Sequence, residues 1–205
     1  MSDTGYTEKY TPSLEGLLCF SAALPRFLSG EDTPRNWLET CLETISAREK
    51  DVKAFTFLDA EGARKAADGS SRRYKDGRPL SPLDGMPVAI KDLFDTVDLP
   101  TQKGGPFLKG WNAGRDAAHV YALRQGGALI LAKAHTTEFG AGAPAPTRNH
   151  YDLSRAPGGS SSGPAASVAA QMLPFSSASH GRGSGIRPAS YCCLYALSPS
   201  MARST

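Results

Sequence analysis

Two clusters of glycine and serine in the second half of the chain contain the residue types that chemistry at a serine requires. The first cluster, Gly158 to Gly163, has the sequence Gly-Gly-Ser-Ser-Ser-Gly and precedes a stretch of small residues. The second cluster runs from Gly181 to Ser190 and includes Ser184. Glycines beside a serine allow several backbone N–H groups to point at one spot, as in an oxyanion hole. A tight surface turn has the same composition, so both interpretations are open.

The first cluster allows three interpretations. Glycine-rich turns before helices bind phosphate, but neither of the two common nucleotide-binding glycine motifs is present. Gly159 to Gly163 also fits the Gly-x-Ser-x-Gly pattern of a nucleophile elbow, yet a proline-containing loop precedes it and no acidic residue follows it. We therefore reject a Ser-His-Asp hydrolase. A serine activated by a lysine is the third interpretation.

Lys91 is the candidate for such a lysine. Lysine acts as a base only when it is neutral, and burial lowers its pKa. Lys91 follows the apolar segment 87–90, which predicts a buried strand. A lone lysine at a strand end is more often solvated, so composition alone does not decide its role.

Ser184 follows Ser160 by 24 residues, and one helix and one strand between them would bring both serines together.

The elements that must position these residues alternate between strand and helix, which predicts an α/β fold with helices covering the sheet. Thr33 as N-cap and Pro34 at the first helical position predict a helix start. Strands are expected at 55–58, 87–90 and 128–132, and helices at 34–45, 60–67, 116–125 and 162–172.

Three further segments are expected to differ from these strands and helices. Residues 1–34 are predicted to form an N-terminal arm, since their apolar stretch is broken by Pro25. Residues 71–82 are basic and loop-like, after Asp68-Gly69-Ser70 at the end of a helix. Residues 140–159 are a long connection, and long loops inside compact domains are usually functional.

Composition and charge narrow the class of protein. The 205 residues are 40% hydrophobic and 21% charged, which are ordinary values for a globular domain. A net charge of +3 is too small to suggest nucleic acid or an anionic membrane as a direct partner. No apolar run is long enough to span a bilayer, and the N-terminus lacks the apolar core of a secretory signal.

The cysteines indicate a reducing compartment. Their spacing contains no Cys-x-x-Cys pair and no zinc-binding partner motif, so a structural metal site is not expected. We expect four free thiols and a cytoplasmic protein. The four are Cys19, Cys41, Cys192 and Cys193.

Four motifs in a fixed order resemble the amidase signature family, which includes proteins like the A subunit of glutamyl-tRNA amidotransferase. They are Gly85-Met-Pro-Val-Ala-Ile-Lys-Asp-Leu-Phe94, Thr137-Glu-Phe139, Pro157-Gly-Gly-Ser-Ser-Ser-Gly163 and Gly183-Ser-x-Ile-Arg-Pro-Ala-Ser190. The resemblance extends from about residue 35 to about residue 200. It implies a mixed sheet flanked by helices, with residues 35–205 as the N-terminal part of the family's domain, incomplete at the C-terminus.

The resemblance also implies a Ser-cis-Ser-Lys triad. Ser184 would be the nucleophile, Ser160 the bridging serine beside a cis peptide bond, and Lys91 the base. The backbone N–H groups of Gly181, Arg182, Gly183 and Ser184 would form the oxyanion hole. The family hydrolyses carboxylic amides or transfers ammonia from glutamine. A small-molecule amide is thus the implied substrate, with no metal or organic cofactor.

The chain departs from the family's pattern near the second cluster. Arg182 replaces a residue that is normally tiny, and His180 replaces a residue that normally helps to fix this loop. Cys193 and Ala196 stand where glycines are usual, and Ser198 where lysine is usual.

Two hypotheses about function follow. The chain is an active amidase, or it is a truncated, catalytically inactive fragment or a subunit that depends on a complementing chain or oligomer.

Overall fold

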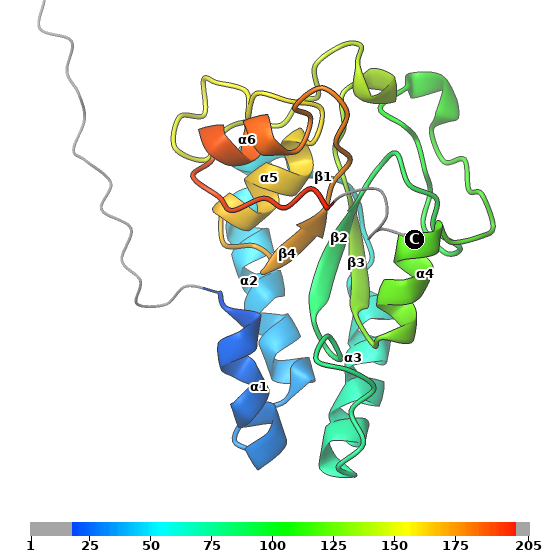
Figure 1. Cartoon of the computed structure of the whole chain (residues 1–205), viewed down its shortest axis with the longest axis vertical. Coiled ribbons are helices and arrows are strands. Elements are labelled where there is room, and N and C mark those ends of the chain that lie inside the picture. The colour runs from blue at the N-terminus through cyan, green and yellow to red at the C-terminus, as the bar shows by residue number, and fades with distance from the viewer. Residues whose placement is uncertain (1–17, 200–205) are drawn as a thin grey trace, which may run out of the picture.

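A four-stranded mixed sheet forms the centre of the protein (Figure 1), in a computed structural model that describes residues 18–199. Its strands are β1 (Phe55–Leu58), β2 (Pro87–Lys91), β3 (Leu129–Ala134) and β4 (Phe175–Ser177). The spatial order is β1-β3-β2-β4. Strand β2 is parallel to both of its neighbours, and β1 is antiparallel to β3. The predicted α/β class with a mixed sheet is therefore confirmed.

Within residues 18–199, six α-helices accompany this sheet, and Figure 1 shows α5 and α6 together on the side of β4, with α4 on the other side of the β2–β3 pair. None of these helices is long and apolar enough to cross a membrane. Two short 3₁₀ turns, η1 and η2, lie in the connections. The bounds are α1 (Phe20–Ser29), α2 (Pro34–Val52), α3 (Ala60–Lys75), η1 (Pro106–Leu108), α4 (Ala118–Gln125), η2 (Glu138–Gly140), α5 (Ser162–Ala169) and α6 (Ile186–Tyr191).

The predicted start of α2 is confirmed in detail. Thr33 has an extended backbone, and its side chain accepts a hydrogen bond from the Asn36 N–H at 3.1 Å. Pro34 occupies the first helical position, where a missing N–H costs nothing. The apolar stripe of α2 faces the core, and its buried residues include Trp37, Leu38 and Ile45.

The apolar stretch near the N-terminus is a helix that runs through Pro25, although Pro25 was expected to break it. The part of that stretch before residue 18 lies outside the described residues. Phe20 and Phe27 of α1 are buried, and their rings make edge-to-face contacts with Trp37 and Tyr74 respectively. This packing offsets the backbone hydrogen bond that proline removes.

Helix α3 is longer than expected, so the prediction of a loop beginning at residue 71 is wrong. The helix continues through Gly69 to Lys75. Its buried positions recur at helical spacing and end with Ser70 and Tyr74, so tertiary packing outweighs the low helix propensity of glycine. The basic residues that suggested a loop occupy the last turn, where cations stabilise the helix dipole.

The two central strands are buried along their whole length, which fixes the residues at their carboxyl ends. Every residue of β2 and β3 is buried. Lys91 ends β2 and pairs in register with Ala134 of β3. The long connection before α5 and the short one after β4 both return to this end of the sheet, as the hydrogen bonds Thr137 N–H to Ser160 O and Ser161 N–H to Ser184 O show.

Candidate active site

Lys91 is the centre of a hydrogen-bonded cluster of serines. Its side chain is fully buried, and the Nζ atom donates to the Oγ atoms of Ser160 at 2.8 Å, Ser161 at 2.9 Å and Ser179 at 2.7 Å. No carboxylate within residues 18–199 forms an ion pair with it. Burial without a counter-charge therefore lowers the pKa of Lys91 to about 8.

Small residues at the start of α5 allow the serine cluster to approach the strand ends. The N–H of Gly163 donates to the His135 carbonyl at 3.0 Å. A Cβ atom at Gly163 would clash with the backbone nitrogen of His135 and the backbone oxygen of Ala54, so only glycine fits there. This close contact brings Ser160 and Ser161, just before the helix, within reach of Lys91.

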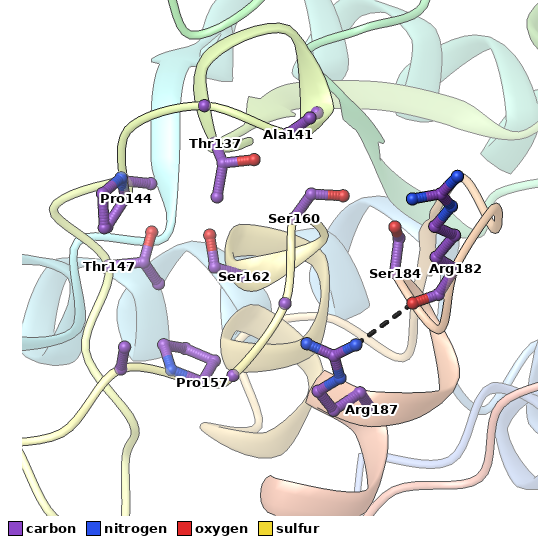
Figure 2. A pocket seen from close by; sticks show the side chains of 16 residues that line it. Thr137, Ala141, Pro144, Thr147, Pro157, Ser160, Ser162, Arg182, Ser184 and Arg187 are labelled. Carbon is purple, nitrogen blue, oxygen red and sulfur yellow. Dashed lines mark hydrogen bonds between the residues drawn. The ribbon is translucent and has the colours of Figure 1, made fainter.

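Ser184 lies in the loop between β4 and α6, across a cavity from Ser160. The cavity has a volume of about 390 Å³, and Ser160 and Ser184 both line it (Figure 2). Of the three serines bonded to Lys91, only Ser160 lines this cavity. Across the described residues, no hydrogen bond joins the Ser160 and Ser184 hydroxyls directly. The structure thus brings Lys91 and Ser160 into contact and places Ser184 across a shared space.

The loop around Arg182 leaves its backbone donors available. Within the described chain, the N–H groups of residues 181 to 184 donate to no protein acceptor. The loop carbonyls accept hydrogen bonds from neighbouring elements: the Ser161 N–H donates to the Ser184 oxygen at 3.2 Å, and the N–H and Nη2 of Arg187 donate to the Gly183 and Arg182 carbonyls at 3.0 and 3.1 Å. Across the base of the loop, the Gly185 N–H donates to Nδ1 of His180 at 3.3 Å. Gly183 has φ of +85°, a backbone conformation that favours glycine. Available N–H groups beside a serine are what an oxyanion hole requires.

One implied feature is absent. The described peptide bonds are all trans, so the cis peptide bond that the family resemblance implied beside Ser160 is not observed.

Sequence reasoning missed two of the three Lys91 partners and a second buried lysine. Ser161 and Ser179 carry no local signal that separates them from the other serines. Lys133 of β3 is fully buried and lies 3.3 Å from an equally buried Asp92. A charged residue inside the apolar segment 129–134 was the available signal. Lys133 also donates to the Phe94 carbonyl at 2.8 Å and so fixes the turn after Lys91.

The expected free thiols are confirmed, since all four cysteines are unpaired. Burial raises the pKa of Cys41 to about 12 and that of Cys192 to about 11, so both are protonated at neutral pH.

Comparison with known proteins is consistent across sequence and structure. A family model described as Amidase matches residues 36–205. The A subunit of glutamyl-tRNA(Gln) amidotransferase from Chloroflexus aggregans is 36% identical over 192 residues, which are 91% of this chain and 39% of that protein. The corresponding protein of Acidothermus cellulolyticus is 40% identical over 165 residues, or 78% of this chain and 33% of that protein.

The comparison with solved structures also finds amidases. A native peptide amidase from Stenotrophomonas maltophilia superposes with a TM-score of 0.79 at 30% identity, covering 87% of this chain and 39% of that one. The chain therefore spans about two fifths of the length of the proteins that it matches.

Proposed function

Because the chain belongs to the amidase signature family, we propose that it hydrolyses carboxylic amides through a serine acyl-enzyme. In this proposal Ser184 is the nucleophile, Ser160 is the bridging hydroxyl and Lys91 is the base. The observation that carries it is the 2.8 Å contact between Lys91 and Ser160, made by a buried lysine with a lowered pKa at the edge of the cavity that Ser184 lines.

The first step transfers one acyl group and two protons. Neutral Lys91 accepts the proton of Ser160, and Ser160 accepts the proton of Ser184 as the Ser184 oxygen attacks the amide carbon. The tetrahedral intermediate collapses with cleavage of the C–N bond. The proton returns from Lys91 through Ser160 to the leaving nitrogen. Water then attacks the ester by the same route, which releases the acid and restores Ser184.

The chemical state of Lys91 fits this sequence of steps. The three Nζ–Oγ contacts suit both protonation states, because the ammonium can donate to all three serine hydroxyls, whereas the neutral amine can donate to two and accept from the third. A pKa of about 8 allows the neutral form to be populated near physiological pH, which an exposed lysine does not allow. The absence of a carboxylate partner among residues 18–199 supports this role, because such a partner would hold the lysine protonated.

The mechanism also requires an oxyanion hole, and the loop 181–184 is the candidate for it. The negative charge on the carbonyl oxygen would be stabilised by N–H groups that have no acceptor in the described chain. A bulky side chain at Arg182 leaves the backbone donors in place, since the side chain and the N–H of a residue are separate groups.

A second candidate function is a catalytically inactive chain or a subunit completed by a partner. Two observations favour it. The hydroxyls of Ser160 and Ser184 are not bonded to each other in the described structure, and β4 is an edge strand that pairs only with β2. Phe175 on this strand is 41% exposed, and the unpaired edge of a strand is a surface on which another strand can add.

The proposal is tested by release of ammonia from short primary amides by the purified chain. We expect release by the original protein and loss of release in Ser184→Ala, with little effect of a chelator. Ser154→Ala, which changes an exposed serine in the 140–159 connection, is the matched control. A folded protein that releases no ammonia, or release that persists in Ser184→Ala, would contradict the proposal.

A further inference from the structure

The cavity beside Ser160 and Ser184 has an unusual lining for an amide-binding site. No aromatic residue, leucine, isoleucine, valine or methionine is among the described residues that line it. Apart from its two arginines, the lining consists of glycine, alanine, proline, serine and threonine. Sites for aryl or long acyl groups use large apolar side chains for most of their contact, so this cavity suits a small and polar group.

Three residues with hydroxyl side chains lie along one side of this cavity. Thr137, Thr147 and Ser162 line it, and Figure 2 shows them grouped on the side away from Ser184. Their hydroxyl oxygens are buried without a hydrogen-bond partner in the described structure.

The only charged side chains in the described lining are those of Arg182 and Arg187. No aspartate or glutamate lines the cavity, and neither arginine forms an ion pair within residues 18–199. Asp152 is the last acidic residue of the sequence. The two guanidinium groups therefore give the site a positive charge that nothing in its lining neutralises.

Arg187 is held in a defined place beside Ser184. It lies on α6, and its Nη2 atom donates to the Arg182 carbonyl at 3.1 Å. Figure 2 shows its guanidinium pointing into the cavity between Ser160 and Ser184. One hydrogen bond uses one of five guanidinium donors, so the others are available to a ligand. A planar guanidinium matches a carboxylate by two parallel hydrogen bonds.

We propose that the cavity selects short amides that carry a carboxylate a few bonds from the scissile carbonyl, with Arg187 as the main carboxylate ligand and Arg182 as a second cation. Mono-amides of small dicarboxylic acids, such as succinamate, have this chemistry. The inference rests on the proposed amide hydrolysis for its biological meaning. The binding preference is an independent property of the cavity.

The experiment compares succinamate with butyramide, a neutral amide of similar length. Calorimetric titration gives both affinities for Ser184→Ala, and ammonia release gives kcat/KM for the original protein. We expect succinamate to be preferred by about tenfold or more, the range that a charge-assisted pair provides. The preference should shrink with added salt.

The variants Arg182→Gln and Arg187→Lys separate the two arginines. The Arg182 side chain makes no hydrogen bond in the described structure, so Arg182→Gln removes charge without removing a contact. Arg187→Lys retains the charge and loses the paired donors. Both should reduce the preference for succinamate, whereas Arg78→Gln, an exposed change outside the cavity, should not.

The outcomes separate the inference from the proposed function. Equal binding of the two amides, or a preference that survives in both variants, overturns the inference even if the protein is active. Selective binding of succinamate that depends on these arginines, without any ammonia release, supports the inference and contradicts the proposed function.

Discussion

The Nζ atom of Lys91 lies 2.8 Å from the Oγ atom of Ser160, at the point where a fully buried strand meets the glycine-rich start of a helix. The same Nζ atom also forms hydrogen bonds to the Oγ atoms of Ser161 and Ser179. On the neighbouring strand, Lys133 is equally buried but is paired with Asp92. The two lysines thus lie in the same sheet in opposite electrostatic situations, and only Lys91 is left without a carboxylate in the described structure.

The rate of Ser184 acylation should rise with pH. Lys91 has a pKa of about 8, lowered by burial, and it accepts a proton only after it has lost its own. At pH 7 about one tenth of the molecules have the neutral base, and well above pH 8 nearly all do. A fluorophosphonate labelling rate measured from pH 6 to 9.5 should therefore increase and reach a plateau. A rate that is flat or falls over this range would exclude Lys91 as the base.

The three serines around Lys91 should contribute unequally. Ser160→Ala should slow acylation by about 10²–10⁴-fold, the usual contribution of a positioned proton-transfer group. Ser161→Ala and Ser179→Ala should have smaller effects, because these serines contact Lys91 but do not line the cavity. Labelling rates of the three variants check this. An effect of Ser179→Ala larger than that of Ser160→Ala would assign the bridging role to Ser179.

Much of the arrangement was accessible from the sequence because it depends on local patterns. Apolar segments predicted β2 and β3, and the Thr33-Pro34 pair predicted the start of α2. The two serine clusters do line one cavity, as their spacing suggested.

The features that sequence reasoning missed depend on tertiary contacts. Ser179 meets Lys91 only because β4 pairs with β2 across a long separation in the chain. Helix α3 continues past Gly69 because its buried face packs against α2. The helix propensities of single residues do not include this packing. The pairing of Lys133 with Asp92 likewise requires the register of two strands and a turn.

Lys133→Met should strongly destabilise the protein. It leaves the carboxylate of Asp92 buried without its partner, a change that typically costs about 3–5 kcal/mol. The double variant Lys133→Met with Asp92→Asn should lose less, since no unpaired charge remains. Urea unfolding of both variants measures the free energies. A single variant as stable as the original protein would show that the pair is not essential to the fold.

Gly163→Ala should destabilise the contact between α5 and the strand ends. The added methyl group would meet the backbone of His135 and Ala54, neither of which can move without shifting β3 or the segment before β1. Overpacking of this kind costs about 1–3 kcal/mol. Gly69→Ala in α3 is the control, because its nearest neighbour is a flexible Arg73 side chain at 3.5 Å and alanine favours helix. The midpoint of thermal unfolding should therefore fall for Gly163→Ala alone, and an unchanged midpoint would show that the contact can relax.

The most direct measurement of the central claim is fluorophosphonate labelling of the folded chain, followed by mass spectrometry of the labelled peptide. The account predicts a single adduct on Ser184 that is lost in Ser184→Ala and greatly slowed in Lys91→Met. A folded protein that is not labelled, or is labelled at a different serine, would contradict the assignment of Ser184 as the nucleophile.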